Sequence, residues 1–427
     1  MKKPRGPYEG PRTRFARLSL LAPVFLCAPH LFADEPQGPA KKLILGGYGE
    51  LVYQHFDYSA DVNRYNYPEK FGKENRGITD IPHFVLFASY DFGNSWKFST
   101  EVEFEHGGSG SALEMENEEA GEFEHEIERG GEVVLEQFWL EKTFSDRAHV
   151  RFGHLVVPVG RTNSNHLPNQ YFTVLRPEGE NRILPLTWHE NGIEFWGKTK
   201  HFKYQILLVN GLRAEGFGSS QWIKGGSGSP YEYNIASSWA AAFRVEHRPL
   251  DGLSLALSGY AGQSAANSLK YDRYKGLDGN VTIGAFDAQY NKHGLIVRVN
   301  SVFGSLGDSK EISAINKSLP GLSASPRDNV ASGATTYGIE AGYDVFYGRG
   351  PSQLYPFVRY EYYNSMQKTE PGILADSRYS RKVATAGFNY FATDKIVLKG
   401  EYSKRIFKEP YKSENTISLG VMFAGMF

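Results

Sequence analysis

The sequence has little cysteine, no long apolar run in its main part, and no excess of charge of one sign. Its single cysteine is Cys27, so a chain that begins after this residue has no disulfide, no thiolate nucleophile and no cysteine-ligated metal. After the first 35 positions no apolar run reaches the roughly 18 residues of a membrane-spanning helix, which excludes a helical membrane bundle. The 47 basic and 48 acidic residues give a net charge of −1, and this balance excludes binding of nucleic acid over the whole surface.

Glycine and aromatic residues are abundant instead. The sequence contains 46 glycines, and 14% of its residues are aromatic. Aromatic residues are enriched in strands, and glycine is frequent in turns. The mixture therefore favours short β-strands joined by many turns over long helices.

The first 33 residues have the pattern of an export signal. Several lysines and arginines precede the apolar stretch 18–28, and Ala33 comes directly before the acidic Asp34. A basic region, a short apolar region and a small residue at the cleavage position are typical of a secretory signal peptide. We therefore expect residues 1–33 to be removed, which leaves 34–42 as a short N-terminal lead. A transmembrane anchor is the alternative, although the apolar stretch is too short to span hydrocarbon.

From Leu43 onward, apolar and polar residues alternate over segments of about ten residues, the length of a membrane-spanning strand. A helix would mix the two kinds, because neighbours on a helical face recur at three and four residues. Alternation with a period of two therefore gives each strand one face for lipid and one for water. In the clearest segment Trp96, Phe98, Thr100, Val102 and Phe104 share one face, and Lys97, Ser99, Glu101, Glu103 and Glu105 share the other.

The connectors between these segments alternate in length. Short turns, such as 91–94 and 249–252, alternate along the chain with long polar connectors, such as 263–280. Transmembrane barrels have short periplasmic turns and long extracellular loops. We therefore predict an all-β fold over residues 43–427, a 16-stranded antiparallel transmembrane β-barrel. The predicted strands span 43–54, 82–92, 95–105, 132–144, 148–156, 191–199, 201–210, 239–248, 253–262, 281–291, 294–304, 334–346, 355–363, 382–391, 394–404 and 415–427.

The last predicted strand has one continuous apolar face. Ile417, Leu419, Val421, Phe423 and the terminal Phe427 lie on it. A large soluble β-sandwich or propeller is the alternative to a membrane barrel, because strands that cover a packed core also alternate with a period of two. The repeated order of short turn and long connector weighs against that alternative.

Two features of the chain carry a resemblance to known proteins. A final strand that closes on Phe427 resembles the signal by which outer-membrane proteins are recognised for assembly, and with the export signal it makes residues 43–427 similar to bacterial porins. Segments in the middle of the chain are similar to the phosphate-selective porin O and P family. These are Val150-Arg151-Phe152-Gly153-His154 with Pro158-Val159-Gly160, Trp188-His189-Glu190-Asn191-Gly192-Ile193 with Gly197, and Tyr204 followed by Val209-Asn210-Gly211.

The resemblance implies a passive diffusion channel for small hydrophilic solutes or ions, with an anion preference, in the outer membrane of a Gram-negative bacterium. It also implies a homotrimer in contact with the lipid bilayer, lipopolysaccharide and the outer-membrane assembly machinery, with no cofactor and no nucleic-acid partner. The family's anion path is rich in lysine and arginine, whereas Glu101, Glu103 and Glu361 are predicted to face water here. The ion preference therefore stays open. An adhesin or receptor that binds a partner through the long extracellular loops is the alternative function.

The connector 157–190 is the longest and the third long loop along the chain. Its place resembles that of the porin loop that folds into the barrel, and charged side chains at such a constriction set ion selectivity. One hypothesis is that its charged residues form the pore constriction with two arginines of the wall. The alternative is that its arginines pair with the loop's own glutamates and only fix the loop. The candidates are Arg161, Arg176, Arg182, Glu178 and Glu180 in the loop, with Arg151 and Arg298 in the wall.

The connector 105–132 is strongly acidic, with ten glutamates and one arginine, a net charge of −9. Such a block is usually a solvated segment. The other interpretations are a latch onto a neighbouring subunit and a divalent-cation site, since hard cations prefer clustered carboxylates. The candidate ligands would be Glu114, Glu116, Glu118 and Glu119.

Catalytic motifs are incomplete in this sequence. His125 and Glu126 are followed by Arg129 where a zinc protease has its second histidine. The glycine-rich runs 107–110 and 225–228 match neither a nucleophile elbow nor a phosphate-binding loop. We therefore do not expect an enzyme.

Overall fold

The computed structural model describes residues 43–58, 68–71, 75–108, 114–115, 125–126, 133–227, 234–319 and 329–426. The expected signal peptide, the lead 34–42, Phe427 and most of the acidic connector lie outside these residues. The candidate metal ligands Glu116, Glu118 and Glu119 are therefore outside the described residues, and for Glu114 only the backbone is described.

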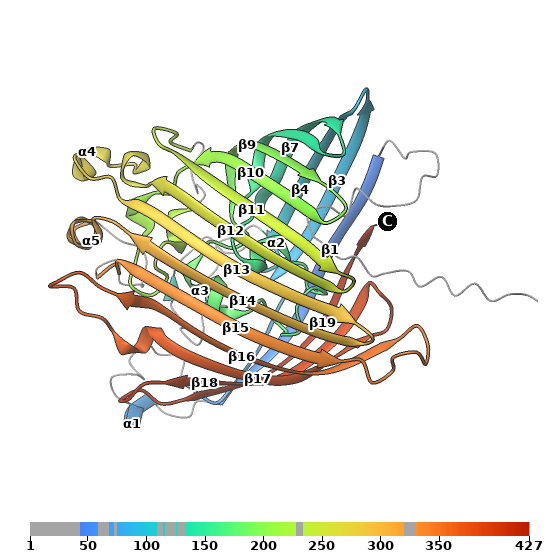
Figure 1. Ribbon diagram of the computed structural model, residues 1–427. Coiled ribbons are helices and arrows are strands. Elements are labelled where there is room, and N and C mark those ends of the chain that lie inside the picture. Colours follow the sequence, from blue (N-terminus) through green and yellow to red (C-terminus); the bar gives the residue numbers. More distant parts are fainter. Residues whose placement is uncertain are drawn as a thin grey trace, which may run out of the picture.

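The chain forms one antiparallel sheet that closes into a barrel of sixteen strands (Figure 1). β1 (Leu43–Phe56) closes the ring by pairing with β19 (Glu414–Met426). β2 (Arg76–Asp80) and β3 (His83–Gly93) pair with successive parts of β1, so that together they form one interrupted strand. The predicted 16-stranded antiparallel barrel is confirmed. The other barrel strands are β4 (Trp96–Glu105), β7 (Val133–Ser145), β8 (Ala148–Val156), β9 (His189–Lys198), β10 (Phe202–Asn210), β11 (Trp239–Leu250), β12 (Leu253–Gln263), β13 (Asn280–Lys292), β14 (Leu295–Leu306), β15 (Gly333–Tyr343), β16 (Gln353–Lys368), β17 (Ser380–Phe391) and β18 (Ile396–Phe407).

The strands differ from the prediction mainly in three places. β2 lies in a segment predicted as an extracellular connector, because these five residues are too few to show a clear alternation and form a strand only by pairing with the end of β1. β16 is longer than the predicted 355–363 and continues to Lys368. A separate pair of short strands, β5 (Glu114–Met115) and β6 (His125–Glu126), lies within the acidic connector and outside the barrel sheet.

The two faces of the strands differ in the way that a membrane barrel requires. On β16 Val358 is 60% exposed, whereas its neighbour Arg359 is only 5% exposed. A soluble β-sandwich would bury the apolar side chain and expose the charged one. The outer surface is therefore apolar and the interior polar, as in transmembrane β-barrels. Other large apolar side chains on the outer face are Leu51, Leu86, Ile206, Leu257, Ile339, Tyr402 and Leu419.

Short helices occupy the interior and one end of the barrel. α2 (Arg161–Ser164) and α3 (Glu178–Ile183) lie within the ring of strands (Figure 1). α4 (Tyr271–Tyr274) and α5 (Ser309–Lys317) lie beyond the end where the long connectors gather. Among the described residues, no helix is long and apolar enough to cross a bilayer. The remaining helices are α1 (Pro68–Phe71) and the 3-10 turns η2 (Ala214–Gly216), η3 (Lys224–Gly226), η4 (Ala265–Asn267) and η5 (Ser377–Tyr379).

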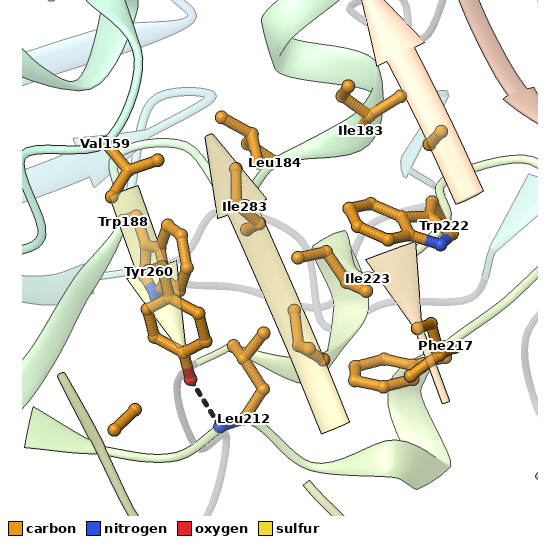
Figure 2. Packing of buried hydrophobic residues seen from close by; sticks show 14 of the residues in the cluster. Val159, Ile183, Leu184, Trp188, Leu212, Phe217, Trp222, Ile223, Tyr260 and Ile283 are labelled. Atoms are coloured by element: carbon orange, nitrogen blue, oxygen red, sulfur yellow. Dashed lines mark hydrogen bonds between the residues drawn. The ribbon is translucent and has the colours of Figure 1, made fainter. Parts of the chain in front are cut away.

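The largest apolar cluster among the described residues packs parts of the long connectors against the barrel wall (Figure 2). The rings of Trp188 and Tyr260 pack with their centroids 4.7 Å apart. The Tyr260 hydroxyl accepts a hydrogen bond of 3.2 Å from the backbone N–H of Leu212. Trp222, in the same connector as Leu212, donates its indole N–H to the carbonyl oxygen of Ala331 at 3.0 Å. This cluster fixes residues 211–227 and the end of connector 157–188 against the wall.

Candidate functional site

The connector between β8 and β9, residues 157–188, runs through the interior of the barrel, and we call it the inward loop. Its ends are joined by a hydrogen bond of 2.8 Å from the N–H of Val157 to the carbonyl of Trp188. Asn163 adds two more links, because its amide nitrogen donates to Val159 at 3.0 Å and its amide oxygen accepts from the N–H of Trp188 at 2.9 Å. Prolines 158, 168, 177 and 185 further restrict its backbone. The loop is therefore a fixed element of the interior.

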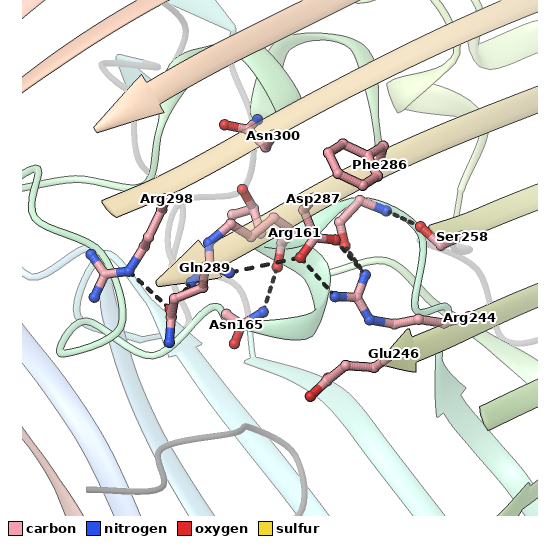
Figure 3. A network of polar contacts seen from close by, with 12 residues as sticks. Arg161, Asn165, Arg244, Glu246, Ser258, Phe286, Asp287, Gln289, Arg298 and Asn300 are labelled. Atoms are coloured by element: carbon pink, nitrogen blue, oxygen red, sulfur yellow. Dashed lines mark hydrogen bonds and ion pairs between the residues drawn. The ribbon is translucent and has the colours of Figure 1, made fainter. Parts of the chain in front are cut away.

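Arg161, at the start of α2, joins the loop to strands β11, β13 and β14 (Figure 3). Its Nη2 donates to Gln289 Oε1 at 2.7 Å, and its Nη1 lies 3.7 Å from Asp287 Oδ1. Asp287 is held from the other side by Arg244, whose two terminal nitrogens donate to its oxygens at 2.7 and 2.9 Å. Arg298 also donates to Gln289 Oε1, at 3.1 Å. Burial and the nearby positive charge of Arg298 both lower the pKa of Arg161.

A second set of arginines continues this network along the wall. Glu340 on β15 accepts from Arg298 at 2.6 Å and from Arg359 at 3.3 Å. Arg359 also donates to Glu361 Oε2 at 3.0 Å. Glu361 in turn accepts the backbone N–H groups of residues 178 and 179 at 3.2 and 3.1 Å, which attaches the first turn of α3 to the wall.

The two predicted loop glutamates have different partners. Glu180 accepts the backbone N–H groups of Arg161 and Thr162 at 3.2 and 2.6 Å, and the side-chain amide of Asn300 at 2.7 Å. Glu178 pairs with Arg405 on β18, whose Nε lies 2.7 Å from its Oε1. Burial alone would raise the pKa of Glu178, but Arg405, the Tyr363 hydroxyl and Arg381 together hold this pKa below its ordinary value. Both carboxylates are therefore held by hydrogen bonds from the wall, and that of Glu180 also by the loop backbone.

On the opposite side, the loop contacts β1 and β4. Arg176 donates to the hydroxyl of Tyr48 at 3.3 Å, and its Nη2 lies 4.0 Å from Glu103 Oε1. His166 lies with its Nε2 atom 3.8 Å from Glu101 Oε1. The inward loop therefore spans the barrel from the β1–β4 wall to the β11–β18 wall.

The structure does not gather the seven predicted constriction residues into one ring. Arg161 and Arg298 meet at Gln289, and Glu180 lies beside them. Glu178 belongs with Arg405, whereas Arg176 lies on the β1–β4 side. Arg182 is buried in α3.

Arg151 lies elsewhere on the wall. It pairs with Glu141 at 2.6 Å and Glu194 at 3.0 Å, and its guanidinium lies 4.3 Å from the ring centroid of Trp139. Its partners are therefore on the neighbouring strands β7 and β9. Among the contacts described, the loop arginines Arg161 and Arg176 pair with wall residues, which differs from the alternative in which they pair with the loop's own glutamates.

A cavity of about 30 Å³ lies between the inward loop and the wall formed by β16 to β19 and β1. Charged groups of both signs line it, together with hydroxyl and amide side chains. A polar cavity of this size is suited to ordered water. Its charged residues are Arg176, Glu178, Glu361, Glu401 and Arg405.

Several residues of this interior were not predicted as site residues. Arg244 and Asp287 alternate with apolar neighbours, so the sequence pattern places both on the water face. Their pairing depends on two strands, β11 and β13, that are separated in the sheet by β12, and no local pattern shows it. His166 and Glu136 are brought close to Glu101 only by the fold.

No protein-family model matches the sequence. A protein of Aquifex aeolicus described as uncharacterized is 25% identical over 383 residues, which covers 88% of this chain and 78% of that protein.

Solved structures with the same architecture are similar at low sequence identity. The anion-selective porin from Comamonas acidovorans is 12% identical with a TM-score of 0.54, over 90% of this chain and 99% of that one. OprB of Pseudomonas putida is 14% identical with a TM-score of 0.52, over 90% and 94%. OmpF of Salmonella typhi, in complex with daunomycin, is 11% identical with a TM-score of 0.52, over 89% and 97%. The chain therefore has the 16-stranded fold of outer-membrane porins.

Proposed function

We propose that this protein is a passive diffusion channel for small hydrophilic solutes or ions in the outer membrane of a Gram-negative bacterium. The observation that carries the proposal is the polar interior crossed by the inward loop, which is attached to both walls through charged side chains. A solute would pass the loop by diffusion, selected by size and by the charges that it meets. The channel would carry out no covalent chemistry and would need no cofactor.

A preference for anions is the finer part of this proposal. It is supported by the guanidinium groups that the wall presents to the interior, namely those of Arg244, Arg298, Arg359 and Arg405. Their charges are partly compensated by Asp287 and other carboxylates, so we expect the preference to be modest. The sequence resemblance to the phosphate-selective porin O and P family makes phosphate the anion to test.

We further propose that residues 1–33 are removed on export and that three copies assemble into a trimer. The apolar outer face supports contact with lipid, and the long connectors at one end would meet lipopolysaccharide. The terminal strand β19, with its outward Leu419 and Val421, is the segment on which recognition by the assembly machinery would act.

Conductance across a planar lipid bilayer tests the function. We expect discrete conductance steps in groups of three and, in asymmetric potassium chloride, a reversal potential that favours chloride. Added phosphate should reduce the chloride current if the channel binds this anion. A membrane-inserted trimer that conducts no ions would contradict the channel and favour an adhesin or receptor that acts through its long loops.

The effect of the Arg405 charge on ion selectivity can be tested, because the neighbouring Lys404 provides a matched control. Arg405→Gln removes a lumen-facing cation and leaves Glu178 without this partner, so the chloride-to-potassium permeability ratio should fall. We expect a change of roughly fivefold, because a unit charge at about 4 Å in water contributes about 1 kcal/mol. Lys404→Gln removes the same charge from the outward face of the same strand and should leave the ratio unchanged. Equal reversal potentials for the two variants would contradict a selective role of Arg405.

A further inference from the structure

Three side chains from separate parts of the chain converge inside the barrel, on the β4–β7 wall. Glu101 comes from β4, Glu136 from β7 and His166 from the inward loop. One ligand atom of each lies within 4.8 Å of the others. All three residues are buried, with exposed fractions of 4%, 0% and 1%. A buried group of one imidazole and two carboxylates is a ligand set found at protein metal sites.

The carboxylates in this group lack the partners that burial normally requires. Within the described part of the chain, neither oxygen of Glu136 has a hydrogen-bond partner, and Oε1 of Glu101 has none either. Buried carboxylates are normally hydrogen-bonded, paired with a cation or bound to a metal. Because Glu136 is completely buried, an ion bound between the carboxylates would supply the missing partner.

The histidine is held in the orientation and tautomer of a metal ligand. Its Nδ1 lies 3.3 Å from the backbone carbonyl oxygen of Asn163. A carbonyl oxygen only accepts, so Nδ1 carries the proton and the lone pair of the neutral ring is on Nε2. In metal-binding histidines the ring nitrogen that does not bind the metal typically donates such a hydrogen bond, which orients the ring. The backbone around Asn163 is itself fixed by the contacts of that side chain with Val159 and Trp188.

Glu101 is oriented in a similar way. Gln137 on β7 donates a hydrogen bond to Oε2 of Glu101, which leaves Oε1 directed toward His166. His166 Nε2 and Glu101 Oε1 are 3.8 Å apart. Two ligand atoms of a tetrahedral Zn²⁺ ion are roughly 3.4 Å apart at bond lengths of about 2.1 Å. A small movement of either side chain would therefore complete the geometry.

We propose that Glu101, Glu136 and His166 bind a divalent transition-metal ion such as Zn²⁺. The imidazole favours Zn²⁺ and similar ions over Mg²⁺ and Ca²⁺, which prefer oxygen ligands alone. Glu103, next on the inward face of β4, also has an Oε1 atom without a hydrogen-bond partner in the described chain and could act as the fourth ligand. Because His166 belongs to the loop and the carboxylates to the wall, the ion would fasten the loop to the barrel.

Calorimetric titration of the purified, chelator-treated protein with Zn²⁺ tests this site. We expect one ion bound per chain, and His166→Gln or Glu136→Gln should weaken binding by about 100-fold or more, since losing even an outer partner of a ligand costs about 10–100-fold. His149→Gln is the matched control, because His149 is also buried and lies 3.4 Å from a carboxylate, that of Glu141, but belongs to no described group of three ligands. The His149→Gln variant should bind Zn²⁺ with the affinity of the wild type.

Two results would overturn the proposal. One is the absence of stoichiometric Zn²⁺ binding by the wild-type protein. This result would indicate that protons shared among the carboxylates stabilise the cluster of Glu101, Glu136 and His166. The other is binding that His166→Gln and Glu136→Gln leave unchanged, which would place the ion elsewhere, such as on the acidic connector. Unchanged circular dichroism and gel mobility of the folded protein would show that the variants fold. Binding is measured without any current, so the result is independent of the proposed channel function.

Discussion

Glu178 shows how single residues fix the inward loop. Its carboxylate binds Arg405 and accepts a hydrogen bond of 2.9 Å from the hydroxyl of Tyr363. Burial raises the pKa of Glu178, but Arg405, Tyr363 and Arg381 together hold it below its ordinary value. A carboxylate with a lowered folded-state pKa stabilises the fold above its unfolded pKa, and this contribution is lost as the pH falls through the folded value.

Glu178→Gln should therefore reduce stability in a pH-dependent way. At pH 7 we expect a loss of about 3 kcal/mol, the effect of removing one partner of a buried ion pair. The difference from the wild type should begin to shrink as the pH falls to roughly 4, the ordinary carboxyl range, and should vanish only below the lowered folded-state pKa, where the wild-type carboxylate is protonated as well. Urea unfolding in detergent at several pH values measures this difference. Glu311→Gln, on the exposed face of α5, is the control and should show no such dependence.

At the level of elements, the pairing of β7 with β8 depends on Gly153. Its φ of +138° is one that residues with a side chain rarely adopt. A Cβ atom added there would lie 2.1 Å from the carbonyl oxygen of Phe138, which is part of the partner strand's backbone. Neither the φ angle of residue 153 nor its distance from the backbone of Phe138 can change easily, because both belong to paired strands. Only glycine therefore fits at position 153, shortly before β8 leads into the inward loop.

Gly153→Ala should weaken this hairpin by about 3 kcal/mol, from the strain at positive φ together with overpacking. A lower yield of folded, heat-modifiable protein on gels would reveal the effect. Gly284→Ala on β13 is the matched control, because nothing lies within 4 Å of a Cβ atom at that position. Equal yields for the two variants would contradict the importance of the Gly153 backbone.

The whole molecule is organised by an inversion of the usual soluble pattern. Leu419 on β19 is 48% exposed, whereas Ser418 beside it is 1% exposed. The same contrast recurs around the barrel, as Val358 and Arg359 show on β16. A barrel of this kind is stable only when lipid or detergent covers its outer face.

Leu419→Arg should therefore destabilise the barrel by about 2–4 kcal/mol, the cost of a basic residue facing the middle of the bilayer. Leu419→Met keeps an apolar surface and should have the stability of the wild type. Unfolding by urea in lipid vesicles measures both. Tolerance of arginine at this position would mean that the strand does not face hydrocarbon.

The inward loop shows where prediction from the sequence stopped. Its place as the third long connector indicated a segment that enters the barrel, but the seven charged residues were expected in one constriction. The structure divides them among Gln289, Arg405, Glu103 and the separate pair of Arg151 with Glu141. These partners lie far away in the sequence, so their identity depends on the strand register and on the path of the loop.

The sequence by itself determined most of the barrel strands and their two faces, because a period of two is a local property that each segment of about ten residues carries alone. The alternation of short turns and long connectors indicated the closed barrel. The sequence could not determine which residues meet in the interior. Glu101, Glu136 and His166 have no spacing that marks them as a group, and only closure of the ring through β1 and β19 together with the path of the inward loop brings them within 4.8 Å. The tertiary structure decided these contacts because they join distant segments, whose separation is fixed by register and closure rather than by local chain geometry.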